Sequence, residues 1–191
     1  MLTPARLVPV AGLAAHIGHG VQRIATDAAI SRMRSIPRHI GELDAAYLAR
    51  LTGHRIESMS ALGGDAGTSS RARLSVTGAG VPVSVFVKMP AETAATRMMG
   101  ELGRLGQTEV RFYQQLADGL PGVPRAYGAT FDALTGRYVL VLEDLTLSSC
   151  EFTDTLHPLD KDRAAATVEV LADRNEEIGR GGEIEGAHPL G

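Results

Sequence analysis

The chain has 191 residues, of which 44% are hydrophobic, which is enough for one globular domain with a buried core. Its formal net charge of -3 and the lack of a dense run of Lys and Arg disfavour binding to nucleic acid or to an anionic membrane surface. The single cysteine, Cys150, cannot form an internal disulfide, so we expect a cytoplasmic protein.

The first 35 residues predict a helical extension. Between residues 5 and 34, apolar positions alternate with His, Arg and Asp in a pattern that favours one or two helices. The most apolar stretch, Leu7 to Val21, is interrupted by Pro9, His16 and His19 and is too short to span a bilayer. It also lacks the pattern of a signal peptide, so we expect no membrane segment.

Residues 36–145 predict a small α+β lobe. It starts with a helix from Glu42 to Leu51, which Gly53 ends as a C-cap. Five runs with strand-like composition follow, at residues 55–62, 71–77, 81–89, 126–131 and 137–143. A helix from Glu101 to Asp118 separates the third run from the fourth, and the fifth run is apolar on both faces, as in a covered central strand. We expect a five-stranded antiparallel sheet with a packed helix and flanking helices.

The remaining residues predict one more helix and a tail. Residues 146–173 leave the sheet and form a helix that opens at Pro158 and runs to about Asp173. Residues 174–191 are rich in glycine and cannot support a core, so we expect a disordered tail there.

Two charged residues lie where the pattern predicts burial. Lys88 ends the third strand on the same face as Phe86 and Ser84. Glu109 lies in the middle of an apolar stripe on the following helix. Because a buried unpaired charge costs several kcal/mol, roughly, we predict an ion pair between Lys88 and Glu109. The alternatives are an edge-strand lysine that blocks aggregation and a glutamate on the helix surface.

The loop before the second strand has residues that suit phosphate. Its glycines Gly63, Gly64 and Gly67 permit close backbone approach, and Thr68 and Ser69 add hydroxyl donors, as does the next residue, Ser70. A Lys fixed by a Glu could contact the same phosphates as a point charge. An ordinary polar turn explains these loop residues equally well.

The fifth strand ends in a segment that is typical of a hinge. The carbonyl of Glu143 and the amide of Leu145 could offer an acceptor and a donor to an adenine edge. Leu62 and either Val85 or Phe86 would then lie near the faces of the ring.

These segments resemble the bacterial aminoglycoside phosphotransferase-like and ecdysteroid-kinase-like proteins, which are relatives of choline kinases and protein kinases. The resemblance covers roughly residues 36–173, and its matching segments are Val85–Lys88, Glu109–Leu116, Val123–Tyr127 and Leu140–Leu145. It implies the nucleotide-binding N-terminal lobe of a small-molecule O-phosphotransferase that uses ATP and Mg²⁺.

By this resemblance Lys88 would contact the nucleotide phosphates, with Glu109 as its partner on the helix. The phosphates would be covered and the adenine bound by the residues Gly64, Gly67, Thr68, Ser69, Glu143 and Leu145.

The resemblance also predicts what the chain lacks. The family's larger lobe carries a catalytic Asp after His and Gly, an Asn one turn later and a second Asp that binds metal. His157 and Asp160 come too early after the hinge to be these residues, so we assign no catalytic residue and no metal ligand. Three hypotheses stay open: a truncated kinase that retains ATP binding, a non-enzymatic kinase-like module that binds a partner or itself through the surface normally covered by the large lobe, and the remnant of a longer gene.

Overall fold

The computed structural model describes residues 4–150, 152 and 158–185. These residues form two compact units. The first comprises the chain up to Asp118 together with Val123–Asp144, and the second comprises Gly119–Gly122 and the chain from Leu145 onward. Each unit is described by itself.

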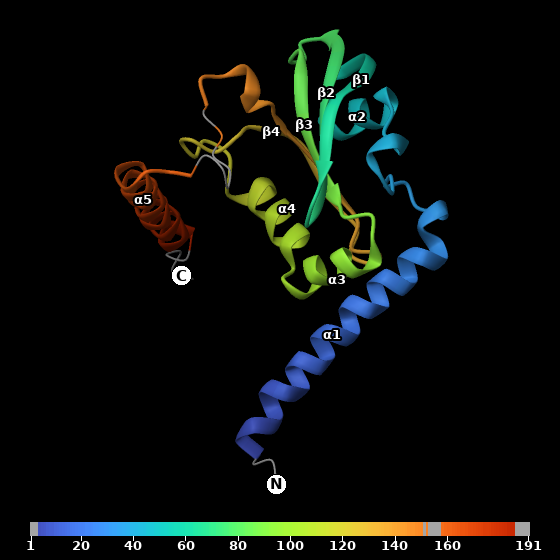
Figure 1. Cartoon of the computed structure of the whole chain (residues 1–191), viewed down its shortest axis with the longest axis vertical. Coiled ribbons are helices and arrows are strands. Elements are labelled where there is room, and N and C mark those ends of the chain that lie inside the picture. Colours follow the sequence, from blue (N-terminus) through green and yellow to red (C-terminus); the bar gives the residue numbers. More distant parts are fainter. Residues whose placement is uncertain (1–3, 151, 153–157, 186–191) are drawn as a thin grey trace, which may run out of the picture. The chain divides into compact units, whose positions relative to one another are not determined.

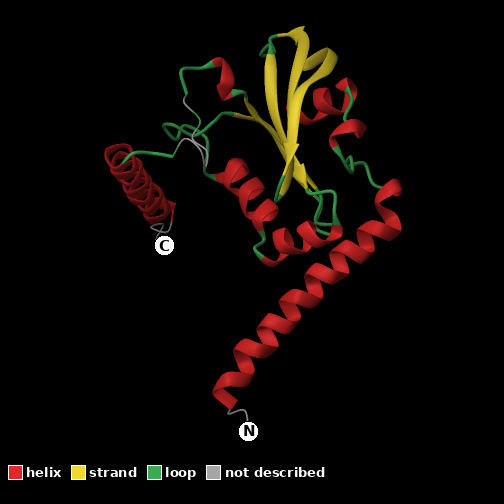
Figure 2. Cartoon of the chain, in the orientation of Figure 1, coloured by secondary structure: helices red, strands yellow, loops and turns green. Residues whose placement is uncertain are grey.

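The first unit is an α+β lobe built on one antiparallel sheet (Figure 2), as predicted. Its strands lie in the order β1-β2-β3-β5-β4. Their bounds are β1 (Arg55–Ala66), β2 (Ser69–Ala79), β3 (Ser84–Pro90), β4 (Ala126–Phe131) and β5 (Tyr138–Glu143). The pairing of β3 with β5 joins two segments that are distant in the sequence, and it places Lys88 opposite Leu140.

The predicted glycine-rich loop is instead the end of a long β1–β2 hairpin. Gly63 and Gly64 belong to β1, and Ser69 already begins β2, so only Gly67 and Thr68 lie outside the strands. A register shift between Ala61 and Gly63 lets the ladder continue. A Cβ on Gly64 would lie 2.5 Å from the carbonyl oxygen of Arg71, so glycine is needed there for close approach of the two strands.

Helices cover both faces of the sheet (Figure 1). One face packs against α2 (Ala45–Thr52), whose Leu48 is fully buried in a cluster with Val85 and Val87. The opposite face packs against α4 (Leu105–Gln115), whose Val110 is buried in a second cluster with Tyr138.

Strand β5 contributes to both of these clusters. Val139 and Val141 belong to the first, while Leu140 and Leu142 belong to the second. This confirms the prediction of a covered central strand. The interaction-module hypothesis assumed that apolar residues around Val139 to Leu147 are exposed; residues 139–142 are instead buried, whereas Leu147 is exposed.

The helix α2 has the predicted C-cap. Gly53 adopts the left-handed conformation with φ of 70°, and its amide donates to the carbonyl of Ala49. At the other end, the Asp44 carboxylate accepts a hydrogen bond of 2.6 Å from the amide of Tyr47. The helix therefore starts later than predicted, and Glu42 belongs to a preceding 3-10 turn, η2 (Ile40–Glu42).

The single helix predicted from Glu101 to Asp118 is two helices. The first, α3 (Ala94–Leu102), starts after Thr93, whose hydroxyl accepts from the amide of Thr96 at 3.3 Å. The chain breaks at Gly103 and at Arg104, which has a positive φ of 49°, and α4 follows. The prediction missed the Thr93 cap and therefore started the helix only at Glu101.

The N-terminal segment is one long helix, α1 (Pro4–Ile30), followed by the 3-10 turn η1 (Ser31–Met33). The last part of α1 packs on α3, where Arg23 forms a 2.9 Å ion pair with Glu101. Asp27, only 3% exposed, pairs with both Arg97 and Arg137. Residues 20–35 are thus attached to the lobe largely by buried charge.

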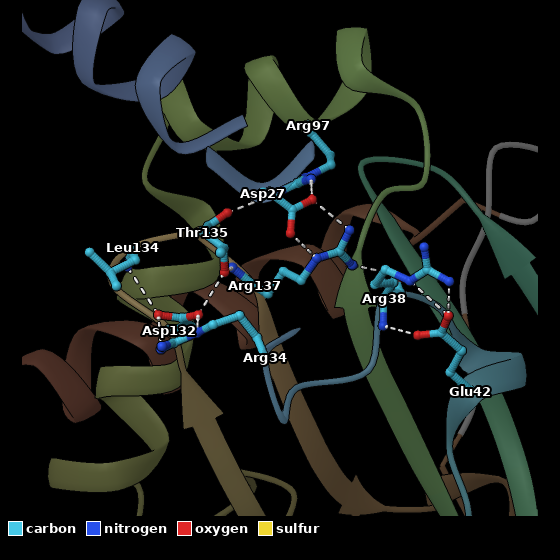
Figure 3. Close-up of polar contacts among 9 residues, drawn as sticks. All are labelled: Asp27, Arg34, Arg38, Glu42, Arg97, Asp132, Leu134, Thr135 and Arg137. Carbon is cyan, nitrogen blue, oxygen red and sulfur yellow. Dashed lines mark hydrogen bonds and ion pairs between the residues drawn. The ribbon is translucent and has the colours of Figure 1, made fainter. Parts of the chain in front are cut away.

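A connected polar network surrounds Asp27 (Figure 3). Arg97 also donates to the carbonyl of Thr135 at 2.8 Å, and Arg137 donates to the carbonyl of Arg38 at 2.5 Å. Beside them, Arg34 forms two hydrogen bonds of 2.9 and 3.0 Å with the carboxylate of Asp132. Every partner is supplied by a segment distant in sequence, so none of these contacts follows from helix or strand periodicity.

The second unit contains η3 (Leu145–Leu147) and α5 (Lys161–Glu185). Asp160 accepts a 2.8 Å hydrogen bond from the amide of Arg163, so it caps this helix. The predicted disorder from residue 174 is wrong up to Glu185, because glycine costs a helix about 1 kcal/mol without forbidding it. The end of the predicted tail, residues 186–191, and His157 lie outside the described residues. Among the described helices, none has the length and apolar character needed to cross a membrane.

Candidate functional site

The predicted ion pair between Lys88 and Glu109 is present. The Lys88 ammonium, on β3, donates to the Glu109 carboxylate, on α4. Both side chains are partly buried, with exposed fractions of 22% and 28%. Val110, the next residue on α4, is fully buried against the sheet, which turns Glu109 toward Lys88. The surface alternatives for these two residues are therefore wrong.

An open cavity of about 510 Å³ borders this ion pair. It brings together four residues predicted for the phosphate site, namely Thr68, Ser69, Lys88 and Glu109. The rest of its lining is Gly103, Leu105, Thr108, Phe112 and Tyr138. The lining thus combines charged and hydroxyl groups with apolar and aromatic side chains.

The sequence reasoning missed Tyr138 as a member of this site. Burial, and then the nearby Glu109 carboxylate, raise the pKa of its hydroxyl, while a hydrogen bond with Ser69 opposes the rise. The hydroxyl therefore remains a neutral donor at physiological pH. Strand alternation could have found it, because Tyr138 lies two residues from Leu140, which pairs with Lys88.

The two predicted glycines do not line this cavity. Gly64 is required by the close approach of β1 and β2, as described above. Gly67 lies at the hairpin tip, where its amide donates to the carbonyl of Ser69 at 3.0 Å. A Cβ on Gly67 would lie 3.4 Å from an Nη of Arg71, so the glycine leaves room for that guanidinium.

The sheet register places further charge beside Lys88. Arg71 on β2 is the direct cross-strand partner of Lys88, and Asp65 on β1 is the partner of Arg71. Arg71 Nε lies 2.8 Å from an oxygen of Asp65, and its Nη2 donates to the other oxygen at 2.9 Å. The sequence reasoning did not find Arg71, because its pairing with Lys88 depends on the register of the β2–β3 hairpin.

The predicted hinge residues lie in two different units. Glu143 ends β5, where it pairs with Val85, and its amide donates to the carbonyl of Arg125 at 2.8 Å. Leu145 begins η3 in the second unit, so a joint adenine site of Glu143 and Leu145 stays a prediction. Either Val85 or Phe86 was predicted to lie near the adenine ring. Val85 packs in the cluster with α2, on the sheet face opposite to Lys88, whereas Phe86 lies on the same face as Lys88.

Asp144, between them, is buried and held to the sheet. Its carboxylate accepts 3.0 Å and 2.6 Å hydrogen bonds from Arg73 Nε and from the hydroxyl of Ser84. Both partners lie on the face of Lys88, because Arg73 pairs with Phe86. The end of β5 is thus fixed by a buried carboxylate.

The resemblance implies a bound metal ion. Within the part of the chain that the structure describes, no three His, Cys, Asp or Glu side chains are grouped so that they could hold a metal ion. The phosphates of a nucleotide fit better, since Lys88, Thr68 and Ser69 line one cavity. Comparisons of the chain with family models, with curated proteins and with solved structures give no match.

Proposed function

We propose that the first unit is a kinase-like small lobe that binds ATP, with the phosphates beside the ion pair of Lys88 and Glu109. The observation that carries the proposal is this pair, which lies at the edge of a cavity shared with Thr68 and Ser69. In kinases, a lysine on the third strand contacts the phosphates and is held by a glutamate from the helix that follows. Here Lys88 lies on β3 and Glu109 on a helix between β3 and β4.

The proposal concerns nucleotide binding, and it derives no step of phosphoryl transfer. Transfer requires Mg²⁺ and a residue that orients the acceptor hydroxyl. The described residues provide no cluster of metal ligands, so we assign neither role to a residue of this chain.

The first test exploits the scarcity of lysine. The chain has two lysines, Lys88 and Lys161. Lys161 begins α5 and is exposed, so it is a matched internal control. An acyl-phosphate derivative of ATP acylates amines that lie beside the bound phosphates and releases ATP. We expect it to label Lys88 in preference to Lys161, and Mg-ATP to suppress only the labelling of Lys88, as mapped by peptide mass spectrometry. Equal labelling of both lysines without protection would contradict the proposal.

A second test measures thermal stabilisation by Mg-ATP. A ligand at 100 times its dissociation constant stabilises the folded state by about 2.7 kcal/mol. We expect a rise in Tm for the wild type and for Lys161→Ala, and a much smaller rise for Lys88→Ala, because removing a charged donor to phosphate costs about 1.5–3 kcal/mol. The same shift in Lys88→Ala and wild type would rule out the assigned site.

A further inference from the structure

Two cations are side by side on the cavity-facing side of the sheet. Arg71 and Lys88 are direct partners in the β2–β3 ladder, and side chains at such positions have Cβ atoms about 4.5–5.5 Å apart. Like charges in direct cross-strand opposition destabilise a sheet. Arg71 and Lys88 therefore need negatively charged partners, which can be side chains of this chain or a bound anionic ligand.

Each cation has one carboxylate on its outer side. Glu109 pairs with Lys88, and Asp65 pairs with Arg71, so the two cations lie side by side between two carboxylates. The carboxylate of Asp65 does not fully satisfy Arg71. Arg71 Nε lies 2.8 Å from a carboxylate oxygen of Asp65. Its buried N–H nevertheless has no acceptor in hydrogen-bonding geometry among the described residues.

The bond between Arg71 and Asp65 is also the weaker of the two pairs. Their side chains are 40% and 65% exposed, compared with 22% and 28% for Lys88 and Glu109. Exposed ion pairs are worth only about a two- to fivefold change in an equilibrium. An anion with more charge than one carboxylate could therefore displace Asp65 while the Lys88 pair stays in place.

We propose that Arg71 is a second phosphate-binding cation beside Lys88, and that Asp65 holds the Arg71 guanidinium until a ligand replaces it. This inference rests on the proposed function and deepens it. Strands lie about 4.8 Å apart, so the two cations suit neighbouring phosphates of one chain better than a single phosphate. The guanidinium fork can bind two phosphate oxygens at once. The ligand class is thus a nucleoside di- or triphosphate, and Asp65 is its competitor.

The test is calorimetric titration of the full chain with two probes, Mg-ATP and inorganic tripolyphosphate. Arg71→Gln should weaken Mg-ATP binding by about tenfold or more, since it removes a charged donor. Arg71→Lys keeps the charge but loses the fork, so it should recover part of the affinity. Asp65→Asn should increase the affinity for both probes by about two- to fivefold, because it removes the carboxylate that competes for Arg71. Arg55 and Glu57 form an exposed pair elsewhere on β1, and Arg55→Gln and Glu57→Gln should leave both affinities unchanged.

The outcomes separate this inference from the proposed function. If the wild type binds Mg-ATP through Lys88 while Arg71→Gln binds it equally well, the inference fails and the proposed function stands. Weaker binding by Asp65→Asn would also overturn it, because that carboxylate would then support the ligand. If the wild type binds neither probe, both proposals fail. Unchanged far-UV circular dichroism of each variant excludes loss of folding as the cause.

Discussion

Replacement of Asp27 by alanine should destabilise the lobe more than any surface change. The Asp27 carboxylate is the shared partner of Arg97 and Arg137, and all three side chains are less than a tenth exposed. Removal of one partner from a buried ion pair costs about 3–5 kcal/mol, because it leaves an uncompensated buried charge. Here the loss leaves two guanidinium groups, of which Arg97 keeps the carbonyl of Thr135 and Arg137 keeps that of Arg38. These remaining bonds to neutral oxygens do not neutralise the charge, so we expect a cost within that range.

Such a loss is large compared with the whole stability of a domain, which is about 5–15 kcal/mol. Equilibrium unfolding in urea, followed by circular dichroism, measures this loss of unfolding free energy as a lower urea concentration at the midpoint, with an unchanged dependence of the free energy on urea. Asp27→Asn is the companion variant, because it keeps the shape and removes only the charge. Glu57→Gln, which alters the exposed pair with Arg55, should cost less than about 1 kcal/mol. A cost below about 1 kcal/mol for Asp27→Ala would refute the view that charge anchors α1.

Two further predictions concern the packing beside the cavity and the response to acid. A Cβ on Gly106 would clash with the ring of Tyr138, whereas one on Gly100 meets nothing within 4 Å. In the same urea assay, Gly106→Ala should therefore lower the unfolding free energy by about 1–3 kcal/mol. Gly100→Ala should be neutral or stabilising by up to about 1 kcal/mol. The hydrogen bond from Arg38, opposed by burial, lowers the pKa of Glu42 from 4.5 to about 2. An ionised carboxylate whose pKa is lower in the folded than in the unfolded state stabilises the fold at a pH above the unfolded-state pKa. The difference in unfolding free energy between wild type and Glu42→Gln should therefore be complete above pH 4.5 and should shrink as the pH falls to about 2. A difference that does not depend on pH would contradict this reasoning.

Periodicity predicted the parts of the fold that depend on neighbours in sequence. The bounds of β4 were predicted as they are, and so was the ion pair of Lys88 and Glu109. The apolar stripe in which Glu109 was placed is, however, exposed at Leu102, Leu105 and Leu116. The ion pair could be predicted because few other partners were available for two charges that were both expected to be buried.

The remainder depends on contacts between distant segments or on local caps. Arg71 faces Lys88 because the turn between β2 and β3 sets the register of that ladder, and the composition of the turn alone does not fix this register. The pairing of Asp27 with Arg97 and Arg137 depends on where α1 packs, which no period predicts. The tail was predicted as disordered because glycine was weighted above the helix-forming residues between Lys161 and Glu185.

The ladder between β3 and β5 has a consequence for how the lobe folds. β1, β2 and β3 can pair by local hairpins, and so can β4 and β5, but Lys88 meets Leu140 only after a long chain segment has been closed into a loop. Closure of that loop costs entropy before it brings any contact, so this step is expected to be the slow one. Since β3 carries Lys88 and β5 carries Tyr138, the walls of the cavity assemble only at that late step, and no early folding intermediate should possess them.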